Sequence, residues 1–121
     1  MKILIVDDSD VVRSIVRQAL VLGGYKDIEE AADGDEALTK AKVLHGQVGL
    51  FVLDVNMPKM DGITLVGELR KLGAQAPIIM LTTETEKSKM VRAKELGATG
   101  WIIKPFNGEK FLEVVRMFVR S

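Results

Sequence analysis

The chain is predicted to fold as one α/β domain, spanning residues 1–121, built around a parallel sheet. Two observations predict this class. Short, almost wholly apolar runs recur along the chain, and each is followed by a segment with the periodicity of an amphipathic helix. Because this alternation occurs five times, we expect a doubly wound (βα)5 arrangement, a five-stranded parallel sheet with helices on both faces. A (βα)8 barrel would need about twice the length.

The first two predicted units combine a buried strand with an edge strand. Lys2–Val6 is nearly all apolar, which is typical of a strand buried on both faces, whereas Asp27–Ala31 alternates apolar and acidic residues and predicts an edge strand. Between them, Asp10–Leu22 has the period of a helix, and Gly23-Gly24 is expected to end it. The apolar residues expected on the core face of this helix are Val12, Ile15, Val16, Ala19 and Leu20.

Capping residues, glycine and proline delimit the later elements. Asp33-Gly34-Asp35-Glu36 is a capping-box pattern, so a helix is expected from there to about His45. Pro77 stands at the first position of a strand, where its missing N–H donor is best tolerated. The other expected strands and helices are Leu50–Leu53, Asp61–Leu72, Pro77–Leu81, Glu86–Leu96, Trp101–Ile103 and Gly108–Arg120.

Composition argues against several classes of function. The chain has 17 basic and 17 acidic residues, so its net charge gives no reason to expect binding to nucleic acid or membranes. It has no cysteine, which rules out disulfides and thiolate metal sites. No apolar run is long enough to cross a bilayer, and the first predicted strand already begins at Lys2, where a signal peptide would stand. We therefore expect a cytoplasmic monomer with no output domain.

Reactive side chains stand at the carboxyl ends of four predicted strands. Asp7 and Asp8 follow the first strand, Asp54 the third, Thr82 the fourth and Lys104 the fifth. In a parallel sheet all strands end at the same edge, and ligands bind in the crevice outside that edge. We therefore expect three carboxylates, a hydroxyl and an ammonium group to meet at one place.

The three carboxylates indicate a site for a hard divalent cation. Carboxylates about 4 Å apart repel by roughly 1 kcal/mol in water and about 4 kcal/mol at an effective dielectric constant of 20, so they need a cation or a proton between them. Oxygen ligands without cysteine or clustered histidine favour Mg²⁺, Mn²⁺ or Ca²⁺, and a site with few carboxylates suits Mg²⁺ best. The alternative is that Asp7 and Asp8 only cap the next helix, although two successive acids exceed what a cap needs.

Asp54 is the candidate nucleophile of this site. A carboxylate beside a metal ion can attack a phosphoryl group and become an acyl phosphate. Lys104 would then partner a phosphoryl oxygen as a compact point charge. A Lys104–Pro105 bond in the cis form would fix the direction of its ammonium group. The alternatives are that Lys104 is a solvated lysine and that Thr82 is only a helix cap.

These residues resemble the receiver domain of bacterial two-component response regulators. The resemblance spans the whole chain, and its segments occur in the same order as in that family. They are Val6-Asp7-Asp8-Ser9, Asp54-Val55-Asn56-Met57-Pro58 with Asp61-Gly62, Leu81-Thr82-Thr83, Gly97-Ala98 and Lys104-Pro105-Phe106. The resemblance implies the flavodoxin-like, CheY-like strand order 2-1-3-4-5, a known property of that fold. It also implies a phosphorylation-activated signalling switch, which is not an enzyme beyond its own phosphorylation and dephosphorylation.

The resemblance implies roles for the residues around the metal. Asp54 would be the phosphoacceptor and would receive its phosphoryl group from a histidine kinase. Asp8 and Asp54 would bind Mg²⁺ directly, together with the main-chain carbonyl of Asn56, and Asp7 would hold a metal-bound water molecule. Asn56 and Glu84 occupy the two positions that tune loss of the phosphoryl group in this family.

The resemblance also implies how phosphorylation is detected. Thr82 would swing its hydroxyl onto a phosphoryl oxygen, and Lys104 would bridge to the same group. Trp101 stands where the family has an aromatic switch residue, usually Tyr or Phe, so its larger ring departs from the pattern. The surface of the fourth helix, fifth strand and fifth helix would then change and bind a target. Residues expected on that surface are Lys87, Lys89, Met90, Arg92, Lys94 and Trp101; a merely solvated basic face is the alternative.

Within the family, this chain is most similar to stand-alone CheY-like chemotaxis regulators. The similarity rests on Asn56, Glu84 and Gly100-Trp101-Ile102-Ile103-Lys104, and it implies a flagellar motor switch target and a phosphatase partner. Three alternatives remain: a receiver acting as phosphate sink or adaptor outside chemotaxis, a Mg²⁺-dependent aspartyl phosphatase, and a flavin-binding protein of the same fold. Asp7-Asp8 would repel a flavin phosphate, and Asp54-Val55-Asn56 lacks the Asp-x-Asp pattern of such phosphatases.

Overall fold

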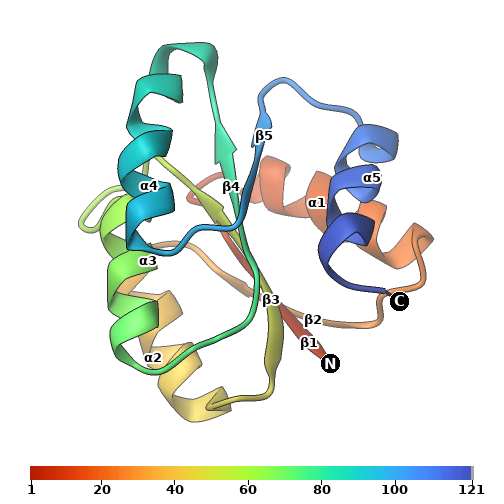
Figure 1. The fold of residues 1–121 in the computed structure, drawn as a ribbon. Helices are drawn as coiled ribbons and strands as arrows, with labels where there is room; N and C mark the ends of the chain where they lie inside the picture. The colour runs from red at the N-terminus through yellow and green to blue at the C-terminus, as the bar shows by residue number, and fades with distance from the viewer. Residues whose placement is uncertain (121) are drawn as a thin grey trace.

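The computed structural model describes residues 1–120 and has three layers, with a parallel sheet between two layers of helices (Figure 1). The strands are β1 (Lys2–Val6), β2 (Asp27–Ala31), β3 (Val48–Asp54), β4 (Ile78–Thr82) and β5 (Gly100–Ile103), in the order β2-β1-β3-β4-β5. The helices are α1 (Asp10–Leu22), α2 (Gly34–Leu44), α3 (Gly62–Lys71), the 3₁₀ helix η1 (Glu84–Lys89), α4 (Met90–Leu96) and α5 (Gly108–Phe118). The predicted fold class and strand order are confirmed.

Both faces of the sheet are covered, which explains the apolar runs. Ile3 and Ile5 pack in a core with α1 and α5, whereas Leu4 and Val6 pack in a second core with α2, α3 and α4. Figure 1 shows these two groups of helices on opposite faces of the sheet. Because alternate residues of a strand point to opposite faces, each central strand contributes to both cores. Within residues 1–120, no helix has the length and apolar character that a membrane span requires.

One predicted helix is wrong in its first half. We expected a continuous helix over Glu86–Leu96, but the chain forms η1 over Glu84–Lys89 and becomes α-helical only at Met90. The segment of η1 has no apolar side chain, so no core contact favours an α-helix before Met90 packs in the core. The other observed boundaries lie within two residues of the predicted ones.

Two side-chain predictions need correction. Ile15 was expected on the core face of α1, but it is 44% exposed, because Val16 and Ala19 fill the position between α1 and the sheet. The capping box of α2 is also shifted. Asp33 accepts a hydrogen bond from the Glu36 amide as expected, but the Glu36 carboxylate accepts from the amide of Ala32, one residue earlier than the usual pattern.

Gly62 lets the start of α3 lie directly against the end of β3. A side-chain Cβ at this position would overlap the main-chain oxygen of Asp54, and the Gly62 amide donates to the carbonyl of Val55 at 2.8 Å. The absence of a side chain at residue 62 therefore determines how closely the helix approaches the backbone of Asp54.

We predict that Gly62→Ala destabilises the protein, whereas Gly67→Ala on the same helix does not. Gly62→Ala forces the backbone at Asp54 to move, and we expect a loss of about 1–3 kcal/mol. An added Cβ at Gly67 meets only Leu96 at 3.6 Å, so the substitution should stabilise α3 by up to about 1 kcal/mol. Urea unfolding followed by circular dichroism measures both changes. Equal stability of the two variants would contradict this account.

Candidate functional site

The carboxyl edge of the sheet brings the predicted site residues together. Asp7 and Asp8 directly follow β1, Asp54 is the last residue of β3, Thr82 is the last residue of β4, and Lys104 follows β5. Carboxylate oxygens of Asp7, Asp8 and Asp54 lie within 4.8 Å of one another. The predicted convergence of three carboxylates from two separate strands is therefore present in the fold.

Lys104 joins this acidic cluster through hydrogen bonds. Its Nζ donates to Asp54 Oδ1 at 2.8 Å and to Asp7 Oδ2 at 3.5 Å. The main-chain amide of Lys104 donates to the carbonyl of Thr82 at 2.6 Å, which ties the residue to the end of β4. The Lys104–Pro105 bond is cis.

The three carboxylates differ in exposure. Asp7 is 1% exposed and Asp54 is 4% exposed, whereas Asp8 lies on the solvent side of the cluster. Asp7 Oδ1 accepts a hydrogen bond from the Ser9 amide at 2.9 Å. Because Asp7 and Asp54 are buried and Asp8 is exposed, solvent reaches the site from the side of Asp8.

The cluster holds more negative charge than Lys104 can offset. Burial raises the pKa of Asp54 to about 6; the hydrogen bond from Lys104 opposes this rise, while the charges of Asp7 and Asp8 add to it. Burial likewise raises the pKa of Asp7. The pKa of Lys104 is also raised: burial would lower it, but its hydrogen bond to Asp54 and the charge of Asp7 outweigh burial.

The donor set fits a hard divalent cation. With all four groups ionised, three carboxylates and one ammonium leave two negative charges uncompensated. One Mg²⁺ ion would balance these two charges. The ligand atoms are oxygens, and one acid is exposed, so a cation could keep several water ligands, as Mg²⁺ prefers. The residues that could hold it are Asp7, Asp8 and Asp54.

The side chains of the remaining site residues make no hydrogen bond to this cluster within residues 1–120. Thr82 is fully buried, and its hydroxyl donates to the carbonyl of Thr83 at 3.2 Å. Asn56 and Glu84 are both exposed. Among residues 1–120, no hydrogen bond links Thr82 to Asp54 or Lys104. In this structure the partner of the Thr82 hydroxyl is therefore a main-chain carbonyl and not a group of the acidic cluster.

The expected partner surface needs one correction. The four basic residues expected there are exposed, and Trp101 is 45% exposed. Met90, the first residue of α4, is however only 5% exposed, because it belongs to the core that includes the apolar face of α3. Its neighbour Val91 is 68% exposed and is the apolar residue that α4 presents to solvent. The basic residues are Lys87, Lys89, Arg92 and Lys94.

Sequence reasoning missed Arg13, which contacts the site from α1. Its Nη1 donates to the main-chain carbonyl of Asp7, and its Nε donates to Glu30 on β2 at 3.0 Å. No residue pattern could have identified this contact, because one partner is a main-chain atom and the other lies 17 residues away. His45, the only histidine of the chain, is an exposed residue at the C-terminal cap of α2.

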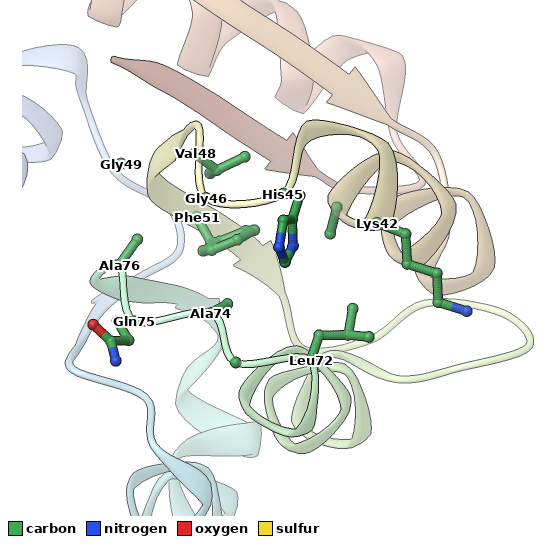
Figure 2. Close-up of a pocket in the computed structure, with 12 residues that line it drawn as sticks. Lys42, His45, Gly46, Val48, Gly49, Phe51, Leu72, Ala74, Gln75 and Ala76 are labelled. Carbon is green, nitrogen blue, oxygen red and sulfur yellow. The ribbon is translucent and has the colours of Figure 1, made fainter.

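A separate hollow of about 690 Å³ lies at the opposite, amino end of the sheet (Figure 2). It is lined by the end of α2, the start of β3 and the segment after α3, and His45 points into it. Residues Val48 and Asp54 mark the two ends of β3, which are about 20 Å apart in an extended strand. The hollow therefore belongs to a different part of the molecule from the acidic cluster.

Sequence comparison with known proteins identifies a family that matches most of this chain. A family model described as the response regulator receiver domain matches residues 3–116. The chemotaxis protein CheY of Bacillus subtilis (strain 168) is 37% identical over 114 residues, which cover 94% of this chain and 93% of that protein. The probable transcriptional regulator ycf27 of Porphyridium aerugineum is 42% identical over 98% of this chain, but the chain spans only 48% of that relative.

Solved structures with a similar fold are also response regulators. The chemotaxis response regulator CheY4 of Vibrio cholerae superimposes with a TM-score of 0.87 at 42% identity, and 98% of each chain is covered. A putative response regulator from Chloroflexus aurantiacus has a TM-score of 0.87 at 32% identity, with 97% of this chain and 95% of that chain covered.

We predict that Asp54→Asn stabilises the protein in metal-free buffer above pH 6. The pKa of Asp54 is raised from 3.8 to about 6, so the ionised carboxylate opposes folding, and its removal should contribute about 1–3 kcal/mol at pH 7.5. The gain should shrink as the pH falls from about 6 towards 4, because native Asp54 then becomes protonated. Urea unfolding with a chelator present measures it.

The exposed residue Asp10 supplies the control for this experiment. Asp10→Asn should change the free energy of unfolding little at either pH. A stabilisation by Asp54→Asn that grows on acidification would contradict the raised pKa of Asp54.

Proposed function

The chain belongs to the family of response regulator receiver domains of two-component systems, and we propose that Asp54 is its phosphoacceptor. The observation that carries this proposal is the buried Asp54 carboxylate, which shares one site with two other acids and accepts a hydrogen bond from Lys104 at 2.8 Å. Receiver domains act as signalling switches, and a nucleophile beside a cation site is what phosphoryl transfer to such a switch requires.

In the proposed transfer, a carboxylate oxygen of Asp54 attacks the phosphorus of a phosphohistidine on a histidine kinase. The new O–P bond forms as the P–N bond breaks, and the bonding pair stays on the imidazole nitrogen. Because the pKa of Asp54 is about 6, the carboxylate is mostly ionised at neutral pH and can act as the nucleophile. Little other covalent chemistry is needed, so the protein has mainly to orient the groups and neutralise their charge.

Mg²⁺ would neutralise part of the negative charge of the carboxylates and of the transferred group. We propose that Asp7, Asp8, Asp54 and the main-chain carbonyl of Asn56 hold it, with Asp7 acting through water. The distances among the three carboxylates and their excess charge support this assignment. Exposed Asn56 and Glu84 are proposed to tune loss of the phosphoryl group, since both lie where hydrolytic water can reach.

We propose that Thr82 and Lys104 detect the phosphoryl group. Lys104 would transfer one hydrogen bond from the Asp54 carboxylate to a phosphoryl oxygen, and the hydroxyl of Thr82 would leave the carbonyl of Thr83 for the same group. The exposed ring of Trp101 on β5 could then turn, and the surface formed by α4, β5 and α5 would shift between two packings. The charge of that surface suits an acidic target peptide.

Chemotaxis is the proposed setting. Two relatives that this chain covers over nearly their whole length, from Bacillus subtilis and Vibrio cholerae, are chemotaxis proteins. On that basis we propose a single cytoplasmic receiver unit with a kinase, a phosphatase and a flagellar motor switch as partners. A phosphate sink or adaptor outside chemotaxis is the second candidate, because the matched regulator of Porphyridium aerugineum carries a comparable domain within a chain about twice as long. An aspartyl phosphatase is disfavoured by the place of Asn56, where such enzymes have a second aspartate.

We predict that Asp54→Asn abolishes labelling by radioactive acetyl phosphate in the presence of Mg²⁺. The amide is a far weaker nucleophile than the carboxylate, so no acyl phosphate should form. Asp61→Asn is the control, since Asp61 only caps α3, and it should label like the unmodified protein. Stoichiometric labelling of Asp54→Asn would disprove the assignment of the phosphoacceptor.

We predict that Lys104→Ala still accepts the phosphoryl group but switches poorly, because the group that senses the phosphoryl oxygen is lost. With beryllofluoride and Mg²⁺ bound, amide signals of α4, β5 and α5 should shift in the unmodified protein and shift much less in the variant. Lys110→Ala, which removes an exposed lysine from α5, is the control and should respond normally. A normal response of Lys104→Ala would contradict the role given to Lys104.

A further inference from the structure

The Asp8 carboxylate is the least restrained of the three acids. Asp7 accepts hydrogen bonds from the Ser9 amide and from Lys104, and Asp54 accepts one from Lys104. Within residues 1–120, no hydrogen bond or ion pair joins the exposed Asp8 side chain to another group. The direction of this carboxylate is therefore determined by the backbone that carries it.

Arg13 holds that backbone. The carbonyl of Asp7 and the amide of Asp8 belong to one planar peptide unit, so restraining the carbonyl oxygen restrains the orientation of the whole unit. Arg13 Nη1 donates to this oxygen. The preceding peptide unit is also restrained, because the amide of Asp7 donates to the carbonyl of Ala31 on β2 at 3.2 Å. The turn from β1 into the acidic pair is thus held from α1 and from the edge strand.

The Arg13 guanidinium is itself fixed by Glu30. Arg13 Nε donates to Glu30 Oε1 at 3.0 Å, and Arg17, one turn later on α1, donates to Glu30 Oε2 at 2.6 Å. Burial tends to raise the pKa of Glu30, but the hydrogen bonds from Arg17 and Arg13 outweigh it and lower the pKa. The Arg13 side chain is only 17% exposed, so this arrangement is more restrained than a surface ion pair. Arg17 ends at the carbonyl of Ile28 and does not reach the site.

We propose that Arg13 is a positioning residue that directs the Asp8 carboxylate towards the bound cation; this rests on the proposed function of the site. The planar guanidinium donates to Glu30 and to the Asp7 carbonyl at once, in directions that a lysine ammonium cannot reproduce. On charge alone, a guanidinium near the cluster would weaken cation binding. Its contribution is therefore geometric, and a test must keep the charge constant.

The test compares Arg13→Lys with Arg17→Lys. Both variants keep the positive charge, and each replaces one of the two guanidinium groups that donate to Glu30. We expect Arg13→Lys to bind Mg²⁺ about tenfold more weakly by isothermal titration calorimetry, the size of effect seen when a partner that orients a metal ligand is lost. Arg17→Lys should bind Mg²⁺ as the unmodified protein does. In metal-free protein, the amide signals of Asp8 and Ser9 should shift or broaden in Arg13→Lys only.

Thermal unfolding of both variants shows whether they are folded at the temperature of the titration. A variant that is fully folded there but binds Mg²⁺ more weakly has lost the positioning of Asp8 and not its general stability. If Arg13→Lys fails to fold, Glu30→Asp tests the same arrangement, because it keeps the negative charge but draws the carboxylate back from Arg13, and it should also weaken Mg²⁺ binding. Affinity of Arg13→Lys within twofold of the unmodified protein, or an equal loss in Arg17→Lys, would overturn the proposal. Failure of the unmodified protein to bind Mg²⁺ would overturn the proposed function as well.

Discussion

Repulsion among three carboxylates at one edge of the sheet is the constraint on which the rest of the site depends. Asp7 and Asp54 are almost fully buried, Asp8 lies beside them, and Lys104 is the one ammonium that bonds to this cluster among residues 1–120. In an unfolded chain these acids would separate in water. The two hydrophobic cores hold the strands, and with them the acids, at distances that the charges alone oppose.

This opposition explains why the site can act as a switch. An arrangement with uncompensated negative charge gains more from a bound cation than a balanced site would, and in the proposed switch that cation would also offset the charge of the phosphoryl group. The Thr82 hydroxyl is bonded to the neighbouring carbonyl of Thr83 when nothing is bound, so it is available for exchange. A ligand that binds one packing better than the other shifts the population by that difference in affinity.

Much of the fold follows from local patterns. The strands at the centre of the sheet are buried on both faces, so their apolar runs identify them regardless of what packs against them. The predictions from sequence that proved wrong have a common cause. The exposure of Ile15, the burial of Met90 and the 3₁₀ conformation of η1 each depend on which neighbouring element occupies the available core surface, and a single helix's periodicity does not contain that information.

By itself, the sequence determined the residues of the candidate site, because strands of a parallel sheet end at one edge and Asp7, Asp8, Asp54 and Lys104 all stand at strand ends. Only the tertiary structure decided how those residues are held. The hydrogen bond from Arg13 ends on the main-chain carbonyl of Asp7, and Gly62 lies against the main-chain oxygen of Asp54, so one partner in each contact is an atom that every residue type possesses. Such contacts arise from the packing of α1 and α3 on the sheet, so they leave no signature in the order of side chains.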